Sequence, residues 1–163
     1  MENRYDHVME CLRFNFPERH LPCDEFQIQK LEGTLGSRLP EDYRHFIEKY
    51  GMTTFRPSVK YPDFQRPEKD GGGIESFYGF NSNDSRDLFR AWKGSQGQIP
   101  AHYLPIADGP DNTICLELTG PQRAAVFVHL LNPEYEGDDL EMDMHLIWPD
   151  FDGFMRNLRL MAK

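Results

Sequence analysis

The sequence predicts an α+β fold, a single domain in which a mainly antiparallel sheet packs against N-terminal helices and a C-terminal helix. Three observations favour this fold. Apolar residues recur with helical spacing in the first third of the chain, form alternating or continuous apolar runs after Pro100, and return to helical spacing after Asp150. The length of 163 residues suits one domain that covers residues 1–163 and buries a core without disulfides or metals.

Three helices are expected in the first third of the chain. Residues 5–16 carry an apolar stripe that a proline terminates, and residues 24–35 form a second helix with Asp24 as its N-cap. The third helix, at residues 40–50, begins with proline and two acidic residues and is followed by glycine, which suits both of its ends. Its apolar stripe should pack against a strand at 124–131 and consists of Tyr43, Phe46, Ile47 and Tyr50.

The middle of the chain has weaker patterns. Prolines divide residues 52–70 into short extended pieces, so any strand there should be short or lie at a sheet edge. The glycines at 71–73 predict a flexible connector, which a strand at 74–80 follows. Asp84 is a candidate N-cap for a short helix whose apolar residues are Leu88, Phe89 and Trp92.

Strands dominate after residue 100, and one helix closes the chain. In residues 114–118, the aliphatic side chains of isoleucine and leucine alternate with cysteine and glutamate, as in a strand with one buried face. Residues 124–131 are apolar on both faces except for His129, which favours a central strand, and residues 144–148 form another. The closing helix is amphipathic, and its apolar residues are Phe151, Phe154, Met155, Leu158 and Ala162.

The net charge of −9, from 27 acidic and 18 basic residues, argues against partners that are themselves anionic. Nucleic acids and anionic membrane surfaces are therefore not expected as partners. A basic protein partner would be attracted to such a chain, although the same charge can serve solubility alone.

The sequence carries no signal for export or for membrane insertion, and a cytoplasmic location is expected. No run of about 18 apolar residues is present, and the N-terminus is too polar for a secretory signal. The three cysteines are an odd number without a Cys-x-x-Cys pair, which fits a reducing compartment.

Sequence signatures of catalysis and of bound cofactors are missing. There is no Gly-x-Ser-x-Gly elbow, P-loop, Gly-x-Gly-x-x-Gly turn or His-Glu-x-x-His motif. His20 and Cys23 have a metal-like spacing, but no second pair completes a zinc site, and Cys115 suits a buried, inert thiol. No catalytic residue, cofactor or metal ligand is therefore expected.

Three groups of residues resemble a known family in their order and spacing. The first is a helix ending in leucine and glycine, then an "LP-x-D/E-Y" opening of the next helix, here Leu35, Gly36, Leu39, Pro40, Asp42, Tyr43, Tyr50 and Gly51. The second combines Tyr103–Gly109 with Asp111 and the strand Ile114–Leu118, and the third is Asp150–Leu158. Together they resemble the Smi1/Knr4 family, the SUKH superfamily, over about residues 26–160, with the first helix as an extension.

The resemblance implies a non-catalytic, partner-binding protein rather than an enzyme. Many bacterial members resemble immunity proteins, which bind and neutralise a toxin of the same strain, often a nuclease. An acidic inhibitor can occupy the basic surface with which a nuclease grips phosphates. One alternative is a regulatory scaffold like the fungal Smi1/Knr4 proteins linked to cell-wall synthesis. The other is a small-ligand-binding or hydrolytic domain that uses Asp108, Asp111 and His129.

Two groups of residues are candidate binding sites. The segment Asn132–Asp143 has six carboxylates and no basic residue, so it should be exposed. It is either a solvated hairpin loop or an epitope for a basic protein partner, formed by Glu134, Tyr135, Glu136, Asp138, Asp139, Glu141 and Asp143. Asp108 and Asp111 either stabilise a turn or line a pocket, and His129 is either a core histidine or a member of that pocket.

Overall fold

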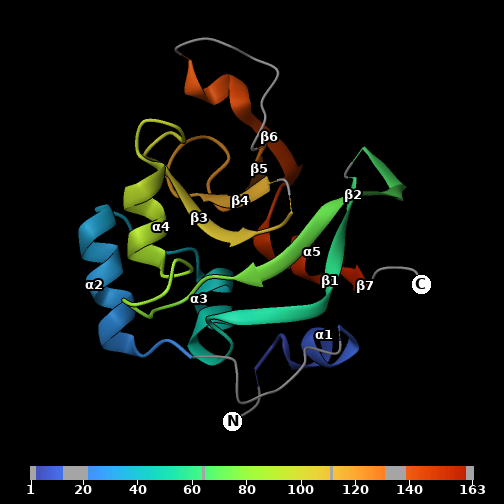
Figure 1. The fold of residues 1–163 in the computed structure, drawn as a ribbon, viewed down its shortest axis with the longest axis horizontal. Coiled ribbons are helices and arrows are strands. Elements are labelled where there is room, and N and C mark those ends of the chain that lie inside the picture. Colours follow the sequence, from blue (N-terminus) through green and yellow to red (C-terminus); the bar gives the residue numbers. More distant parts are fainter. Residues whose placement is uncertain (1–2, 13–21, 64, 111, 131–138, 161–163) are drawn as a thin grey trace.

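A seven-stranded antiparallel sheet forms the centre of the fold, in the order β6-β5-β4-β3-β2-β1-β7 (Figure 1). The computed structural model describes residues 3–12, 22–63, 65–110, 112–130 and 139–160. The chain runs as a meander from β1 to β6, and the short last strand returns to pair with β1. The strands are β1 Thr53–Asp63, β2 Arg66–Phe77, β3 Tyr103–Asp108, β4 Asn112–Glu117, β5 Val126–Leu130, β6 Met144–Trp148 and β7 Arg159–Leu160.

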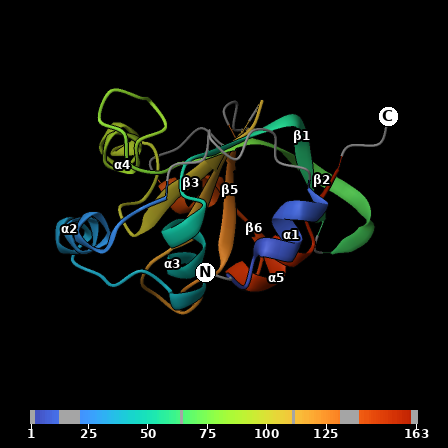
Figure 2. The same ribbon diagram turned by 90° about the horizontal axis from the view of Figure 1, so that it is seen from below.

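Five α-helices and one 3-10 helix accompany the sheet in the described part of the chain. Three of them, α1, α3 and α5, lie on one face of the sheet, whereas α2 and α4 lie together at one side of the molecule (Figures 1 and 2). The helices are α1 Asp6–Cys11, α2 Glu25–Leu35, α3 Glu41–Lys49, α4 Leu88–Ser95, η2 Leu140–Asp143 and α5 Phe151–Arg156. The predicted α+β fold with an antiparallel sheet is confirmed.

The N-terminal helices begin and end where the local sequence signals lie. Asp24 caps α2 through a capping box, in which the backbone N–H of Gln27 donates to the Asp24 carboxylate over 2.8 Å. Pro40 precedes α3, and Gly51 follows it with a φ of 49°, a conformation that glycine adopts at low cost. The first helix covers only the beginning of the predicted range, and residues 13–21 lie outside the described ones.

The main core lies between the sheet and the helices α1, α3 and α5. Phe46 of α3 is fully buried, and its ring centroid lies 4.8 Å from that of Phe77 in β2 and 5.8 Å from that of Phe151 in α5. The whole predicted stripe of α3 is buried, and it shares this core with Val126 and Val128 of β5. Tilted ring contacts of this kind stabilise the helices on the sheet beyond the burial of their area.

A smaller apolar cluster covers the opposite face of the sheet. Cys115 of β4 pairs directly with Phe127 of β5, so their side chains project from the same face. The other members are Ile99, Tyr103, Ala125 and Met144. Since Ile114 and Leu116 belong to the main core, β4 is buried on both faces and is not the half-buried strand that its alternation predicts.

The strands β1 and β2 form a long hairpin where the sequence predicts short pieces and a flexible connector. The glycines at 71–73 lie inside β2, and the ring of Tyr61 lies against Gly71 and Gly72. A Cβ atom at Gly72 would come within 2.5 Å of the Tyr61 hydroxyl oxygen, and one at Gly71 within 2.7 Å of the ring. The glycines therefore make room for a buried tyrosine on the neighbouring strand.

The cap of α4 also differs from the expectation. Asp87, rather than Asp84, precedes the helix and accepts a hydrogen bond from the backbone N–H of Arg90 over 3.1 Å. Asp84 instead forms an ion pair with Arg86, with 2.7 Å between Oδ2 and Nη2. Asp84 and Asp87 can each hydrogen-bond to backbone N–H groups nearby in the sequence. The sequence pattern alone therefore could not show which of them caps α4.

The last helix is shorter than the periodicity predicts. It ends at Arg156, and Arg159–Leu160 form β7 against Val59 and Lys60 of β1. Without this strand, β1 would present an unpaired edge of N–H and C=O groups. The backbone pairing offered by β1 thus competes with the helical pattern of the sequence and prevails.

Candidate functional site

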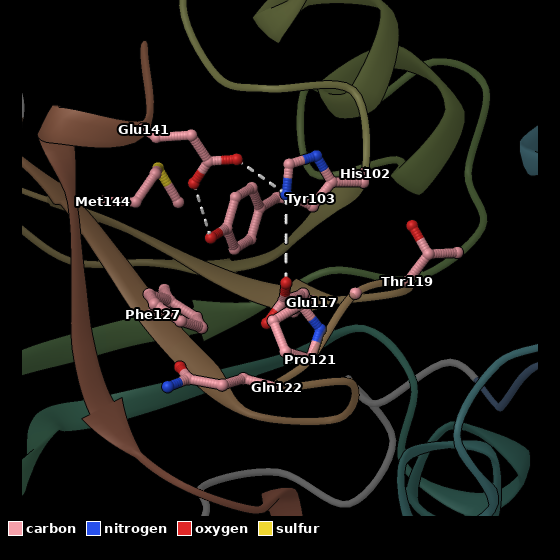
Figure 3. A pocket seen from close by; sticks show the side chains of 10 residues that line it. His102, Tyr103, Glu117, Thr119, Pro121, Gln122, Phe127, Glu141 and Met144 are labelled. Atoms are coloured by element: carbon pink, nitrogen blue, oxygen red, sulfur yellow. Dashed lines mark hydrogen bonds and ion pairs between the residues drawn. The ribbon is translucent and has the colours of Figure 1, made fainter. Parts of the chain in front are cut away.

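A pocket of about 600 Å³ opens beside the second apolar cluster, on the sheet face opposite α3 (Figure 3). We call it the acidic pocket. Aromatic and thioether groups form much of its wall, and two carboxylates and a histidine face one another inside it. The residues that line it are His102, Tyr103, Glu117, Thr119, Gly120, Pro121, Gln122, Phe127, Glu141 and Met144.

His102 lies between the two carboxylates (Figure 3). Its Nε2 is 2.8 Å from Oε1 of Glu141 and 3.9 Å from Oε1 of Glu117. The other oxygen of Glu141 accepts a hydrogen bond from the Tyr103 hydroxyl over 3.0 Å. Burial and this hydrogen bond raise the pKa of Tyr103, so the phenol remains a donor. Glu141 is therefore held by two partners, whereas Glu117 has only a distant histidine.

Glu117 is a buried carboxylate without a close partner. The residue is 4% exposed, and its Oε2 accepts no hydrogen bond from any residue that the structure describes. Burial raises the pKa of its carboxyl group and the charge of Glu141 adds to this, while His102 acts in the opposite direction. An unsatisfied buried group costs about 1–3 kcal/mol, so a ligand that brings a donor or a positive charge would recover part of that cost.

The ladder between β3 and β4 fixes the direction of this carboxylate. Glu117 pairs with Tyr103, so both side chains project from the same face of the sheet. The strand ends there, and the chain turns back until the N–H of Ala124 donates to the carbonyl oxygen of Glu117 over 2.8 Å. Position and exposure of Glu117 are thus set by backbone pairing on both of its sides.

The turn between β4 and β5 is shaped around the same carboxylate. Gly120 has a φ of 114°, and a Cβ atom there would come within 2.6 Å of Oε1 of Glu117. Ala124 has a φ of 75°, a left-handed conformation that costs a residue with a side chain about 1–2 kcal/mol. A strained backbone next to an uncompensated charge is typical of binding sites, where the surrounding structure holds such groups in place.

The acidic segment that the sequence singles out contributes Glu141 to this pocket. Asp139 caps η2, where its carboxylate accepts a hydrogen bond from the backbone N–H of Glu141 over 3.1 Å. Asp143 is 9% exposed rather than solvated, because it leads directly into β6, whose first residue pairs with β5. The remaining predicted residues lie outside the described ones and are Glu134, Tyr135, Glu136 and Asp138.

Asp108 and His129, predicted as members of a second pocket, lie on either side of β4. Both pair with Thr113, so two strand spacings, roughly 10 Å, separate their backbones. Asp108 accepts a hydrogen bond from the Tyr78 hydroxyl over 3.4 Å, and burial raises the pKa of its carboxyl group. His129 is 8% exposed, and burial lowers its pKa because it disfavours the charged imidazolium. Asp111 lies outside the described residues.

The buried cysteines have the properties of inert thiols. Burial raises the pKa of Cys23 to about 12 and raises the pKa of Cys115 even further. Within the described ranges, no cluster of three histidine, cysteine, aspartate or glutamate side chains could hold a metal ion, and His20 lies outside those ranges.

A second hollow of about 400 Å³ lies between α2 and α4 and has the opposite charge. Phe26, which is 74% exposed, lies at this hollow together with Lys30, Arg90 and Lys93. Its one carboxylate, that of Asp87, already accepts hydrogen bonds from two backbone N–H groups. Since none of the buried unpartnered polar atoms in the described residues lies here, the acidic pocket is the stronger candidate.

Sequence reasoning missed the two central residues of the acidic pocket, His102 and Glu117. A signal for Glu117 existed, because it lies within Ile114–Leu118, one of the segments that carry the family resemblance. Its burial could not be inferred, since this depends on how the following turn folds over the carboxylate. His102 stands in a short connection before β3 and has no recognisable pattern around it.

Comparison with known proteins gives this geometry a context. The family model described as SMI1 / KNR4 family (SUKH-1) matches residues 22–157, which is most of the chain. The chain belongs to the SMI1/KNR4 family. The range matched to that family includes every residue that lines the acidic pocket.

The chain is also similar to a prophage-derived bacterial protein. The chain is 29% identical over 147 residues to the SPbeta prophage-derived uncharacterized protein YokK of Bacillus subtilis (strain 168). This match covers 81% of the chain and 72% of YokK. The SMI1/KNR4 family includes immunity proteins and consists generally of non-catalytic members.

None of the helices in the described ranges is long and apolar enough to span a membrane.

Proposed function

We propose that this protein is an immunity protein, which binds a cognate bacterial toxin and thereby neutralises it. Membership of the SMI1/KNR4 family supports this function, because the family includes immunity proteins. The observation that carries the proposal furthest is the buried carboxylate of Glu117, which faces His102 in the pocket and lacks a close partner. Such a group is better suited to receive a cationic partner than to stabilise the isolated fold.

The neutralisation needs no chemical step by this chain. A protein with a net charge of −9 attracts a basic partner over a longer range than direct contacts reach. A nuclease presents such a basic surface because it must bind phosphates, and a bound acidic protein would cover that surface. We propose that the interface includes the acidic pocket and the acidic segment at residues 134–143, to which the pocket residue Glu141 belongs.

Co-expression in the native host or a heterologous one tests the function. The toxin candidate is a secreted protein encoded beside this gene, and its expression alone should stop growth. Growth should recover when this protein is present, and the two proteins should elute together in size-exclusion chromatography. Continued growth arrest, with no complex formed by any neighbouring candidate, would contradict the proposal.

A pair of matched variants tests whether protection depends on the pocket carboxylate or on the net charge of the protein. Glu117→Gln changes one pocket carboxylate, whereas Glu68→Gln removes the same charge from an exposed position on β2. We expect the first variant to protect growth less well at low expression and the second to protect like the wild type.

A further inference from the structure

We propose that the acidic pocket binds one guanidinium group, presented by an arginine side chain of the protein partner. The identity of that partner rests on the function proposed above, whereas the chemistry rests on the pocket itself. The same group also occurs in free arginine and its derivatives, so the experiments below distinguish a protein side chain from a small molecule.

The groups inside the pocket carry an excess of negative charge. Two carboxylates, from Glu117 and Glu141, share a single histidine, and the short contact of His102 is with Glu141 at 2.8 Å. The distance from His102 to Glu117 is 3.9 Å, too long for a hydrogen bond. Whatever the protonation state of His102, the three groups carry at least one uncompensated negative charge when both carboxylates are ionised. One added cation would balance it.

The uncompensated charge lies at the buried carboxylate of Glu117. Glu117 is 4% exposed, and its Oε1 faces His102 while its Oε2 has no partner among the described residues. Charge interactions are strengthened in such a place, because little water is present to screen them. A cation that enters beside His102 therefore gains more from Glu117 than from any exposed carboxylate of the surface.

The shape and polarity of the pocket walls suit a guanidinium group. The rings of Tyr103 and Phe127 meet edge to face, with 5.0 Å between centroids, and the ring of His102 lies 4.4 Å from that of Tyr103. Met144 adds a further apolar wall (Figure 3). A guanidinium group is flat, weakly hydrated and stacks on aromatic rings, and the arginine stem is apolar. These properties favour arginine over the compact, strongly hydrated ammonium of lysine.

Small probes test the chemistry without the partner. N-acetyl-arginine amide should shift the NMR signals of Tyr103, Gly120 and Phe127, whereas N-acetyl-citrulline amide, a neutral molecule of the same shape, should not. We expect Glu117→Gln to weaken binding of the arginine probe about tenfold or more, since it removes the charge from a charged hydrogen bond. Glu68→Gln, an exposed control, should leave binding unchanged. Equal shifts with both probes, or equal binding by both variants, would overturn the proposal.

The complex with the toxin distinguishes the source of the group. In a double-mutant cycle, one toxin arginine changed to alanine should couple with Glu117→Gln, so that the two losses of affinity are not additive. Tight toxin binding by Glu117→Gln, equal to that of Glu68→Gln, would overturn the inference and leave the proposed function standing. If the pocket binds the arginine probe but no neighbouring toxin candidate forms a complex with this protein, the guanidinium site stands and the immunity function is refuted instead.

Discussion

Glu117 combines features that stability alone does not favour. Its carboxylate is buried, the nearest histidine nitrogen is 3.9 Å away, and the turn that covers it includes a left-handed alanine. Proteins tend to retain such costly groups where a ligand or a partner compensates them. The residue therefore allows a test in which binding and stability change in opposite directions.

Replacing Glu117 by glutamine should stabilise the unbound protein at neutral pH. Burial raises the pKa of the carboxyl group above its unfolded value, so the ionised form is less stable in the folded protein. We expect the melting temperature of Glu117→Gln to exceed that of the wild type by about 2–4 °C, which corresponds to about 1 kcal/mol. Differential scanning fluorimetry at pH 7.5 provides the measurement.

The pH dependence of that difference provides the control. As pH falls through the folded pKa of Glu117, the folded protein takes up a proton before the unfolded chain does, so the wild type gains relative stability. The advantage of Glu117→Gln should therefore shrink on acidification and vanish below the unfolded pKa of glutamate. An advantage that stays constant with pH would mean that packing, rather than charge, is responsible.

Asp6 lies at the contact between α1 and α3. Its pKa is lowered in the folded protein, whereas that of Glu117 is raised. Partial burial would raise its pKa, but hydrogen bonds from Lys49, Tyr50 and the backbone of Asn3 lower it to about 2. Its stabilising contribution should be complete above the unfolded pKa of aspartate and should be lost as pH falls through the folded value. Asp6→Asn should therefore lower the free energy of unfolding at pH 7 by about 2 kcal/mol.

Urea denaturation at pH 7 and at pH 2.5 checks this expectation. The difference between Asp6→Asn and the wild type should be large at the higher pH and much smaller at the lower one. Asp70→Asn is the control, because Asp70 pairs with Arg159 at the surface, where ion pairs contribute about 0–1 kcal/mol. Equal effects of the two substitutions at pH 7 would show that the Asp6 network adds nothing beyond an ordinary surface pair.

At the scale of single elements, local signals predicted helices better than strands. Asp24 and Pro40 mark the starts of α2 and α3 because caps and helix dipoles act within a few residues. The hairpin of β1 and β2 depends instead on contacts between strands, such as Tyr61 against Gly72, which no local window contains. The same holds for β7, whose sequence is helical in pattern but whose pairing partner is β1.

The glycines of β2 lead to a prediction about this hairpin. Gly72→Ala would place a Cβ atom 2.5 Å from the hydroxyl oxygen of the buried Tyr61, so the ring or the strand must move. We expect a loss of about 1–3 kcal/mol in the free energy of unfolding, typical of overpacking, as measured by chemical denaturation. Adding Tyr61→Phe should recover part of the loss, because it removes the atom that the new methyl group meets.

Gly94→Ala is the matched control for this substitution. Gly94 lies in α4, and a Cβ atom there would meet nothing within 4 Å. Because alanine favours a helix more than glycine does, the substitution should stabilise the protein by about 0.5–1 kcal/mol. If Gly72→Ala were equally harmless, the flexible connector predicted from the sequence would be the better description of residues 71–73.

At the scale of the whole molecule, composition predicted the sign of the charge but not its distribution. Acidic residues exceed basic ones, yet Lys30, Arg90 and Lys93 gather between α2 and α4, while Glu117 and Glu141 meet in the acidic pocket. The pocket could not be predicted from the sequence, because its residues come from four strands, β3 to β6, from η2 and from the connections beside β3 and β4, and meet only after the sheet forms. The two surfaces should therefore attract partners of different charge.

Steering by the acidic segment predicts a rate of association with the toxin that depends on salt. Charges on this segment act over a screening length of about 8 Å at physiological ionic strength and over longer distances in dilute buffer. Neutralising Glu134, Glu136 and Asp138 should lower the association rate roughly tenfold at low salt and much less at high salt. Glu117→Gln, in contrast, should mainly raise the dissociation rate, because it removes a contact that forms only in the complex.

A second triple variant, with the exposed residues Glu10, Glu68 and Glu75 changed to glutamine, changes the net charge by the same amount at other places. Stopped-flow or surface plasmon resonance measurements at low and high salt compare the two triples. If both slow association equally, the net charge of the protein steers the toxin, and the segment at 134–143 has no special role. If only the first does so, the charges of the acidic segment itself, rather than the net charge of the protein, steer the toxin.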